Sequence, residues 1–371
     1  MTVLHICSSV SRAVGGPARS VQGLVAAQRA AGIDAWLMTL KDLGDPWVPG
    51  IGEYRCAKCP GARGVRKAVE KVLDECRPDL VEVHCMWLPN LHRAIAAVRA
   101  RGIPYVVTPR GSVDAWSLRQ KAWKKRLALL TYQGFDLRHA VAFHTTSDAE
   151  TDQIRRLGCR QPVIQAPNGV NVPDTLPPWR REGPVRRMLF LSRMHEKKGV
   201  LELVEAWDQI RPKGWICELV YSVCDATEAA YEREVRELVS ARGMDGLFVF
   251  SGAVADEDKW QAYRRADCFV LPTHTENFGI AIAEALYAGL PVITTTGAPW
   301  GTVAERHCGW WVKADDVSAL ADALRAATDL PAEALRRMGA RGHDLAVETC
   351  SWTSIAKRMK GEYERVLAWR R

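Results

Sequence analysis

Two carboxylates stand out in the segment THTENFGIAIAEALYAGLPVIT, residues 273–294. Glu276 and Glu284 lie eight positions apart among small and apolar residues. The preceding DCFVLP has the pattern of a buried strand, and FGIAIAEALYAG has the composition of a helix that ends at Gly289. We therefore predict that Glu276 lies in the loop before this helix and Glu284 about two turns into it. The two carboxylates would then flank one ligand without touching each other.

The start of the same helix is suited to an anion. Gly279 leaves backbone N–H groups accessible to a phosphate at the positive end of the helix. A purely structural interpretation is also open, in which Glu276 interacts with the helix dipole and Glu284 is an exposed helix residue. Spacing alone does not decide between the two.

A basic loop follows an earlier strand-like run. In LSRMHEKKGVLELVEAW the strand ends at Ser192, and Arg193, Lys197 and Lys198 precede a helix that begins near Gly199. A guanidinium and an ammonium beside a helix N-terminus suit a diphosphate. Charged loops are also commonly just solvated, so this interpretation stays open as well.

Paired glycines mark the loop after the first strand-like run. Gly15 and Gly16 precede Pro17 and a helical pattern, so a helix N-terminus is expected at the edge of the sheet. The position favours an anion. The alternative is an ordinary tight turn, because the G-x-G-x-x-G dinucleotide pattern is absent.

The elements that must position these residues alternate along the whole chain. Short β-rich runs such as TVLHIC, DLVEVHC, RRMLFLS and DCFVLP are separated by helical patterns. This is the βαβ rhythm of parallel sheets, and 371 residues suit two domains. We predict an α/β protein with an N-terminal Rossmann-like domain over 1–172, a turn-rich linker over 173–185 and a second Rossmann-like domain over 186–351. Ligands of open α/β sheets bind beyond the carboxyl ends of the strands, and we expect the site in the cleft between the domains.

Composition narrows the class of protein. An apolar content of 47% and a charged content of 25% are typical of a globular protein, and no run of 18 uncharged apolar residues occurs. The first residues read as a strand rather than a signal peptide, and eleven scattered cysteines suit a reducing compartment, so we expect a cytoplasmic protein. Cys56 and Cys59 lack a second pair at zinc-ribbon spacing, so no metal site is predicted there.

The net charge of +8 indicates an anionic partner. A nucleic acid, an anionic membrane surface and an anionic small substrate are the three candidates. No RNP-like strand, Cys/His finger or long basic tail occurs, and we therefore expect no nucleic-acid partner.

Taken in order, these motifs resemble glycosyltransferase family 4, and the resemblance covers essentially the whole chain. It is carried by Gly15-Gly16, by Arg193 and Lys198-Gly199, and by Glu276-x7-Glu284 with Asn277-Phe278-Gly279 between the glutamates. PNGVNV before the linker and SWTSIAKRMKGEYERVLAW at the end fit the same family. The resemblance implies a GT-B fold, in which two Rossmann-like domains face each other across a cleft and a C-terminal helix, here 352–371, returns to the first domain.

The resemblance also implies a function and roles for residues. The expected activity is that of a retaining glycosyltransferase, which moves a sugar from a nucleotide-diphosphate sugar to a hydroxyl acceptor. Arg193 and Lys198 would bind the donor diphosphate and Glu276 would contact the donor sugar, so these three are the expected catalytic residues. The other expected donor-binding residues are Gly15, Gly16, Asn277, Phe278, Gly279 and Glu284, the last at the ribose.

A cationic clamp of this kind stabilises the departing nucleotide without a metal, so neither a metal nor another cofactor is expected. Family members of the GT-B type generally lack an Asp-x-Asp metal site. Asp256-Glu-Asp258 is interpreted as the acidic first turn of a helix.

One position departs from the family pattern. Many members have a histidine that binds the donor sugar in a Pro-His-Gly context, whereas this chain has Arg110 in TPRGSVDAW. Arginine only donates hydrogen bonds and stays charged, so it cannot act there as a base. His84 and His144 are alternative contributors, although both also fit as buried histidines with satisfied hydrogen bonds.

A helix over 118–130 is the candidate acceptor-side surface. The segment GSVDAWSLRQKAWKKRLALLTYQGF combines apolar Trp116, Leu118, Trp123, Leu127 and Leu130 with basic Lys121, Lys124, Lys125 and Arg126. Such a helix can lie on an anionic membrane beside a lipid-linked acceptor. A helix that faces the core with a solvated basic side has the same pattern, and both interpretations stay open.

The ending TTTGAPWGTVAERHCGWWV resembles bacterial enzymes of polysaccharide or lipopolysaccharide assembly. We therefore expect a growing surface glycan or lipid-linked acceptor, and a location in the cytoplasm or on the inner face of the cytoplasmic membrane. Two other functions are kept open. One is a nucleotide-sugar epimerase or hydrolase of the same fold, and the other is a nonenzymatic nucleotide-sugar-binding protein.

Overall fold

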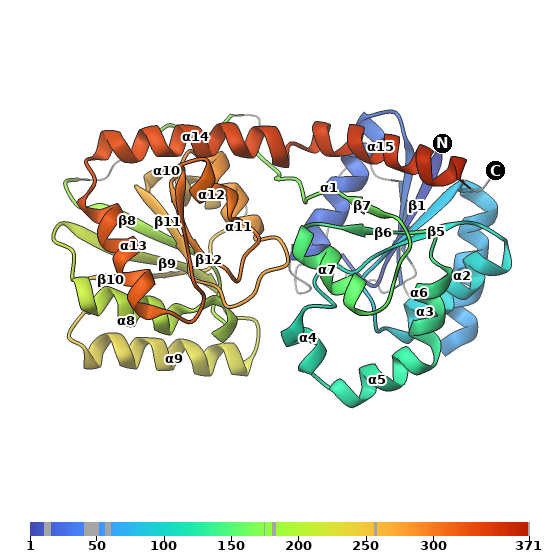
Figure 1. Ribbon diagram of the computed structural model, residues 1–371, viewed down its shortest axis with the longest axis horizontal. Helices are drawn as coiled ribbons and strands as arrows, with labels where there is room; N and C mark the ends of the chain where they lie inside the picture. The colour runs from blue at the N-terminus through green and yellow to red at the C-terminus, as the bar shows by residue number, and fades with distance from the viewer. Residues whose placement is uncertain are drawn as a thin grey trace. The chain divides into compact units, whose positions relative to one another are not determined.

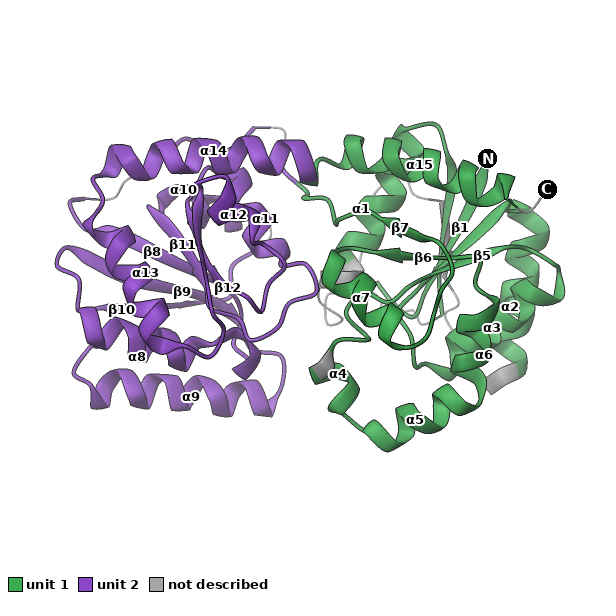
Figure 2. Ribbon diagram, in the orientation of Figure 1, with its two compact units in different colours: residues 1–171, 350–371 green, residues 172–349 purple. Residues whose placement is uncertain are grey.

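The computed structural model describes residues 1–10, 16–40, 52–55, 61–173, 175–179, 183–255 and 258–369. The chain divides into two compact units, shown in Figure 2. Unit 1 comprises Met1–Asn171 and Cys350–Arg371, and unit 2 comprises Val172–Thr349. The division falls one residue before the predicted end of the first domain, and the returning C-terminal segment belongs to unit 1. The segment predicted as a linker is assigned to unit 2.

Unit 1 is built on a sheet of seven parallel strands. Its elements, labelled in Figure 1, are β1 (Thr2–Cys7), α1 (Gly16–Ala30), β2 (Asp34–Thr39), β3 (Gly52–Arg55), α2 (Gly61–Cys76), β4 (Leu80–His84), α3 (Pro89–Ala100), β5 (Tyr105–Thr108), α4 (Ala115–Arg119), α5 (Ala122–Leu130), α6 (Tyr132–His139), β6 (Ala142–Thr145), α7 (Asp148–Arg156), β7 (Val163–Gln165) and the C-terminal α15 (Trp352–Ala368).

The central strands β1, β4, β5 and β6 of unit 1 are buried on both faces. Along β1, Val3 and Cys7 pack on α1 and α15, whereas Leu4 and Ile6 pack into the cluster that includes α2 and α3. Alternation of side chains across a strand produces these two cores. A strand with apolar residues on both faces is typical of a doubly wound sheet.

Unit 2 repeats the architecture with six parallel strands. Its elements are β8 (Arg186–Arg193), the short helix η2 (Glu196–Lys198), α8 (Val200–Ile210), β9 (Trp215–Ser222), α9 (Ala226–Ala241), β10 (Phe248–Gly252), α10 (Lys259–Arg265), β11 (Cys268–Leu271), α11 (Ile280–Tyr287), β12 (Val292–Thr295), α12 (Thr302–Glu305), β13 (Gly309–Val312), α13 (Val317–Asp329) and α14 (Ala332–Cys350). In Figure 1, α8 and α9 lie on one side of this sheet and α11 and α14 on the other.

Strand order identifies where each sheet can receive a ligand. The order is β3-β2-β1-β4-β5-β6-β7 in unit 1 and β10-β9-β8-β11-β12-β13 in unit 2. The direction of winding therefore reverses between β1 and β4, and again between β8 and β11. At such switch points the loops beyond the carboxyl ends diverge and leave a crevice for a ligand. The predicted α/β class with two parallel sheets is confirmed.

Two predicted helices differ in the structure. The helix expected over 118–130 is two helices, α4 and α5, because Lys121 between them adopts a left-handed conformation with φ 51°. The helix after Gly279 begins at Ile280, so Glu284 lies just over one turn in rather than two. Gly279 has a φ of 84°, which keeps the preceding residues out of the helix.

Candidate active site

Lys198 and Glu276 meet at the switch point of unit 2. Lys198 is the last residue of the short helix η2, which follows β8, and Glu276 lies in the loop after β11. Lys198 Nζ donates to Glu276 Oε1. The two side chains are 13% and 17% exposed. The sequence predicted both residues for one ligand, and the structure joins them as an ion pair.

A close backbone approach allows this pairing. Gly199 follows Lys198 with a φ of 68°, and a Cβ there would lie 2.1 Å from the carbonyl oxygen of Pro272. Only glycine fits so close to that carbonyl. The loop after β8 therefore packs directly on the loop that carries Glu276.

Hydrogen bonds hold the Glu276 loop from both sides. The backbone N–H of His274 and the hydroxyl of Thr273 both donate to the Lys197 carbonyl, each at 2.8 Å. The N–H of Glu276 donates to the Gly297 carbonyl at 2.7 Å. The loop is thus fastened to its neighbours after β8 and after β12.

Arg193 is the last residue of β8, one residue beyond the predicted strand end at Ser192, and the sequence did not indicate its partner, Glu228. Its Nη1 donates to Glu228 Oε1 at 3.2 Å, and Glu228 Oε2 accepts the N–H of Cys224 at 2.7 Å. The side chain of Arg193 is 49% exposed, whereas that of Glu228 is 2% exposed. Glu228 therefore orients the guanidinium and leaves part of it accessible.

Phe278 and Gly279 form a packed turn rather than an open loop. Phe278 is buried, its ring centroid lies 5.3 Å from that of Trp300, and Trp300 Nε1 donates to the Phe278 carbonyl. A Cβ on Gly279 would lie 2.9 Å from Ile282 Cδ1. Asn277 immediately precedes this turn. The first N–H groups of α11 point out of the helix end, where an intrahelical partner is lacking by geometry.

Glu284 is buried, so the interpretation of an exposed helix residue is wrong. Only 5% of Glu284 is exposed. Its Oε1 accepts from Lys259 Nζ at 2.5 Å and its Oε2 from the Tyr263 hydroxyl at 3.0 Å. Both partners lie on α10. The sequence indicates Asp256-Glu-Asp258 as the acidic first turn of this helix and does not indicate Lys259 or Tyr263 as partners of Glu284. Asp256 and Glu257 of that turn lie outside the described residues, and Asp258 directly precedes α10.

His274 is a further residue that the sequence did not indicate. Its Nε2 lies 3.1 Å from Glu202 Oε1 on α8, and its Nδ1 contacts Asp315 Oδ1. The hydrogen bond that His274 donates to Glu202 and, after the opposing effect of burial, the one that it donates to Asp315 raise the pKa of His274 to about 9. The ring is therefore an imidazolium at neutral pH that ties the Glu276 loop to two acidic neighbours.

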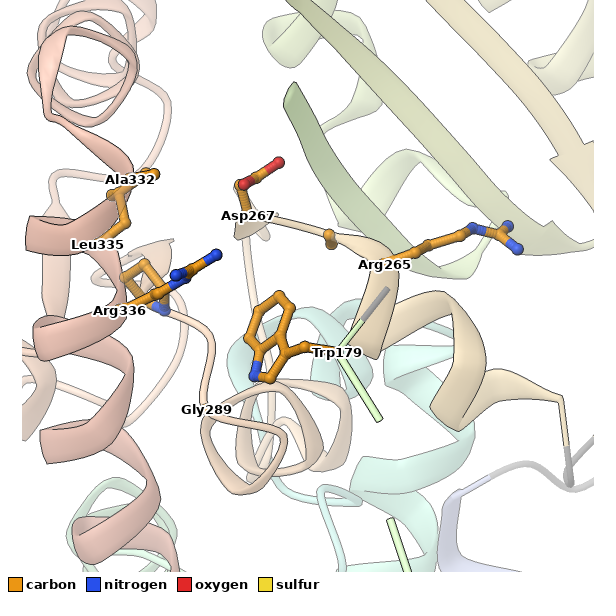
Figure 3. Close-up of a pocket in the computed structure, with 9 residues that line it drawn as sticks. Trp179, Arg265, Asp267, Gly289, Ala332, Leu335 and Arg336 are labelled. Atoms are coloured by element: carbon orange, nitrogen blue, oxygen red, sulfur yellow. The ribbon is translucent and has the colours of Figure 1, made fainter. Parts of the chain in front are cut away.

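A pocket elsewhere in unit 2 is separate from these residues. It is lined by residues that precede β11 and β12, together with Trp179 and α14 residues such as Arg336. In Figure 3, Arg336 extends toward the Trp179 ring, whereas Arg265 points away from it. The pocket thus lies at the amino edge of the sheet, opposite the carboxyl edge that carries Lys198 and Glu276.

In unit 1, Gly16 begins α1, and Gly15 lies outside the described residues. Cys56 and Cys59 lie outside them too. Gly16 follows β1, which is one side of the switch point of this sheet. The two glycines therefore remain predicted rather than observed ligand contacts.

Arg110, His84 and His144 belong to a buried hydrogen-bond network in unit 1. His84 is 0% and His144 is 2% exposed, so neither can contact a ligand directly. Arg110 Nε donates to His84 Nδ1 at 3.1 Å, and His144 Nδ1 lies 2.8 Å from Glu82 Oε1. The interpretation of both histidines as buried and satisfied is confirmed.

Three members of this network lie close enough for a metal ion. Candidate ligand atoms of His5, Glu82 and His84 lie within 4.8 Å of one another. Each ring nitrogen is used, however: His5 Nδ1 lies 2.9 Å from His84 Nε2, His5 Nε2 lies 2.7 Å from Gln28 Oε1, and Arg110 donates to His84 Nδ1. A cation would compete with these bonds and with the Arg110 charge.

The amphipathic segment of unit 1 faces solvent. Trp123, Leu127 and Leu130 of α5 are 67%, 55% and 84% exposed. The interpretation of these residues as core-facing is therefore wrong. Within the described ranges, no helix is both long and apolar enough to cross a membrane.

Two family models match the chain. Residues 15–169 match a glycosyl transferase 4-like domain, and residues 177–344 match glycosyl transferases group 1. The chain is 28% identical over 176 residues to D-inositol 3-phosphate glycosyltransferase of Arthrobacter sp., a match that covers 45% of this chain and 42% of that one.

A second relative aligns over most of its length. The chain is 25% identical to the MMP alpha-(1->4)-mannosyltransferase of Mycolicibacterium hassiacum, over 89% of this chain and 79% of that one. The structure of Anabaena Alr3699/HepE in complex with UDP superposes with a TM-score of 0.78 at 18% identity, covering 98% of this chain and 100% of that chain. At this identity the structural likeness establishes the fold. Together the two family models and the shared fold place the chain among the family 4-type glycosyltransferases with the GT-B fold.

Proposed function

We propose that this protein transfers a sugar, with retention of anomeric configuration, from a nucleotide-diphosphate sugar to a hydroxyl acceptor. The observation that carries the proposal is the Lys198–Glu276 ion pair at the switch point between β8 and β11. A cation and a carboxylate held together there match the charges of a glycosyl transfer, in which the sugar gains oxocarbenium character and the leaving diphosphate gains negative charge.

Arg193 and Lys198 are the proposed diphosphate ligands. Arg193 is half exposed and oriented by Glu228, so its free N–H groups can meet phosphate oxygens. Lys198 would exchange part of its interaction with Glu276 for the phosphate. The N-terminus of α11, after Asn277, Phe278 and Gly279, adds backbone dipoles of the same sign.

Glu284 is the proposed ribose ligand, with one refinement. A carboxylate has about four acceptor sites, and Lys259 and Tyr263 use two on Glu284. Ribose hydroxyls can therefore add to Glu284 without displacing either partner. The Lys259 and Tyr263 contacts would fix the carboxylate in advance and so reduce the entropy lost on binding.

We propose that the transfer needs no metal, because Arg193 and Lys198 supply the positive charge that a divalent ion provides elsewhere. Activity should then be unchanged by a chelator. Product anomers identified by NMR would establish retention, and an inverted product would contradict that part of the proposal.

A lipid-linked or growing surface glycan is the proposed acceptor, at the inner face of the cytoplasmic membrane. Trp123, Leu127 and Leu130 occupy positions i, i+4 and i+7 of α5, which form one face of a helix. Exposed Lys124 and Arg126 flank that face. An exposed apolar stripe bordered by cations is the pattern of a helix that lies in the interface of an anionic membrane.

The charge around α5 supports the same proposal. From residue 115 to residue 135 the sequence has basic residues and neither aspartate nor glutamate. Lys125 is turned the other way and donates to the Ser117 carbonyl, which leaves Lys124 and Arg126 for lipid headgroups. Each cation near an anionic surface contributes roughly 1 kcal/mol to association.

Vesicle sedimentation tests the membrane part. Wild type should bind vesicles that contain phosphatidylglycerol more than pure phosphatidylcholine vesicles, and the triple variant W123S/L127S/L130S should lose that binding. Trp369→Ser is the matched control, because Trp369 is 69% exposed on another part of unit 1. Equal binding by wild type and the triple variant would rule out α5 as the membrane contact.

Turnover on a panel of nucleotide sugars and acceptors tests the transfer itself. The expected result is a glycosylated acceptor and a free nucleoside diphosphate in equal amounts. Sugar released to water or converted to an epimer would instead support the hydrolase or epimerase function. Binding without any turnover would support the nonenzymatic one. The comparisons with glycosyltransferases favour neither alternative.

A further inference from the structure

Arg110 has an unusual backbone conformation at the carboxyl edge of the unit 1 sheet. It follows β5 by two residues, and its φ of 50° lies in the left-handed region that is uncommon outside glycine. The buried Glu150 holds this turn, since its Oε1 accepts the N–H of Gly111 at 2.7 Å and its Oε2 the N–H of Thr146 at 2.9 Å. The surrounding structure therefore keeps Arg110 in a conformation that the chain would not adopt locally.

The Arg110 guanidinium is buried among neutral groups. The residue is 7% exposed, and besides its bond to His84, its Nη1 donates to Ser20 Oγ at 2.9 Å and to Asn168 Oδ1 at 2.8 Å. Over the described ranges, no carboxylate oxygen lies within 4.0 Å of it, and Nη2 has no hydrogen-bond acceptor. Buried charges in proteins are normally paired, because an unpaired one costs considerable desolvation free energy.

Glu82, a carboxylate of the same buried network, is engaged by other side chains. His144 has only acceptors at its two ring nitrogens, Glu82 Oε1 at 2.8 Å and the Ala166 carbonyl at 3.0 Å. Thr108 and Tyr363 donate to Glu82 as well. The hydrogen bonds of Glu82 thus involve His144, Thr108 and Tyr363, and within the described residues none of them involves Arg110.

Neither His84 nor Glu150 compensates for the charge of Arg110. His84 accepts from Arg110 at Nδ1, and burial together with the Arg110 guanidinium holds the pKa of His84 well below its usual range, so the ring is neutral. Glu150 has both oxygens engaged by Gly111 and Thr146 at the N-terminus of α7. Within the described residues, no oxygen of Glu150 lies within 4.0 Å of a nitrogen of Arg110.

The partners of Arg110 come from elements that meet at the switch point of the sheet. Ser20 lies on the second turn of α1, whose N-terminus follows β1, and Asn168 lies in the loop after β7. A helix N-terminus adds positive potential at the same edge. A buried guanidinium with an unused N–H group and a helix start beside it is a site for an anion.

We propose that Arg110 binds an anionic group, a carboxylate or phosphate, that a sugar substrate carries in addition to the donor diphosphate. This inference rests on the proposed glycosyl transfer and specifies the substrate class. The charged group can belong to the donor sugar, as in UDP-glucuronate, or to the acceptor, as in glucose 6-phosphate. Arg110 acts in recognition, because a guanidinium neither accepts nor releases a proton.

Matched pairs of substrates distinguish the two sources. UDP-glucuronate is compared with UDP-glucose as donor, and glucose 6-phosphate with glucose as acceptor, by kcat/KM and by calorimetric binding. Wild type should prefer the anionic member of one pair. Arg110→Gln should lower kcat/KM for that anionic member by about 10- to 100-fold, the usual effect of losing a hydrogen bond to a charged group, and change the neutral member little.

Two further variants keep the test decisive if Arg110→Gln does not fold. Asn168→Asp places a carboxylate 2.8 Å from Nη1 and should occupy the guanidinium, with the same selective loss of the anionic substrate. Arg110→Lys should keep part of the preference. Arg101→Gln, which removes an exposed arginine paired with Asp74, is the matched control and should change neither substrate.

Three outcomes would overturn the inference. They are no preference for either anionic member in wild type, equal loss for charged and neutral substrates in Arg110→Gln, and an unchanged preference in Asn168→Asp. Absence of turnover with every pair would instead refute the proposed transfer, and calorimetry would still show whether the anionic sugars bind through Arg110.

Discussion

At the scale of single residues, the opposite charges of Lys198 and Glu276 determine each other's position. The pair is partly shielded from solvent, and both members lie on loops that glycine and backbone hydrogen bonds hold together. Charges arranged before the substrate arrives need little reorganisation during the reaction. The two residues should therefore act as a unit in catalysis.

Replacement of either residue tests this coupling. Glu276→Gln keeps the side-chain volume and removes the charge, and we expect the transfer rate to fall by about 10²- to 10³-fold, as for the loss of one transition-state contact. Lys198→Met should give a similar loss. The double variant should be little worse than either single one, because residues in one ion pair are not additive.

Initial rates at saturating donor, with circular dichroism as the check on folding, measure these effects. Glu333→Gln is the control, since Glu333 is 81% exposed and pairs with Arg337 at the surface. A folded Glu276→Gln variant with near wild-type transfer would refute the role of Glu276. Fully additive losses would refute the coupling.

At the scale of elements, His274 links the loop after β11 to α8 and to the loop after β13. The ion pairs with Glu202 and Asp315 favour the protonated ring, which raises the pKa of His274 to about 9 from an ordinary value of 6.5. A raised pKa in the folded state means that the stabilisation is fully present below about pH 6.5 and is lost as the pH rises through about 9.

The loop should therefore become less stable between neutral and alkaline pH. We expect the melting temperature of wild type to fall more from about pH 6.5 to about pH 9.5 than that of His274→Gln, which lacks the titrating group. Differential scanning calorimetry of both proteins across this range measures the difference. Parallel pH profiles would show that the His274 interactions contribute nothing to stability.

Some of the site could be predicted from sequence, and the reason is geometric. Arg193, Lys198 and Glu276 each follow a strand-like run, and the carboxyl ends of parallel strands share one edge, so their common location follows from pattern alone. The residues that hydrogen-bond to the site residues cannot be predicted from this pattern. Glu228 and Tyr263 reach the site through the packing of α9 and α10, which no short-range pattern encodes.

The break in the 118–130 segment illustrates the same limit. Its apolar spacing predicted one helix, but Lys121 adopts a left-handed conformation that divides α4 from α5. Periodicity reports which residues share a face and does not report such a local turn. Periodicity also could not show whether the apolar face of α5 packs on the core of unit 1 or is exposed. The choice between a core-facing helix and a membrane-bound helix depended on this.

At the scale of the whole molecule, the C-terminal helix α15 completes the core of unit 1. Ile355, Met359, Tyr363 and Val366 are buried against α1 and the strands β1 and β2. Tyr363 reaches the centre of the network, where its hydroxyl donates to Glu82 Oε2 and accepts from Gln28 Nε2 at 3.1 Å. Residues 281 positions apart are thereby joined.

Tyr363→Phe isolates this link, because it removes the hydroxyl and keeps the ring. Glu82 Oε2 and Gln28 Nε2 would each lose a partner in a site that is 0% exposed, and an unsatisfied buried group costs about 1–3 kcal/mol. We expect unit 1 to be destabilised by an amount of that order and unit 2 to be unaffected. Hydrogen exchange followed by mass spectrometry reports the stability of each unit separately.

Tyr287→Phe is the matched control in unit 2, since in the part of the chain that the structure describes the Tyr287 hydroxyl makes no hydrogen bond. This control should leave exchange in both units unchanged. Faster exchange in β1, β4 and α15 for Tyr363→Phe alone would confirm that the last helix stabilises the first unit through Glu82. Equal exchange in the two variants would show that α15 is held by its apolar face and that the buried hydroxyl contributes nothing.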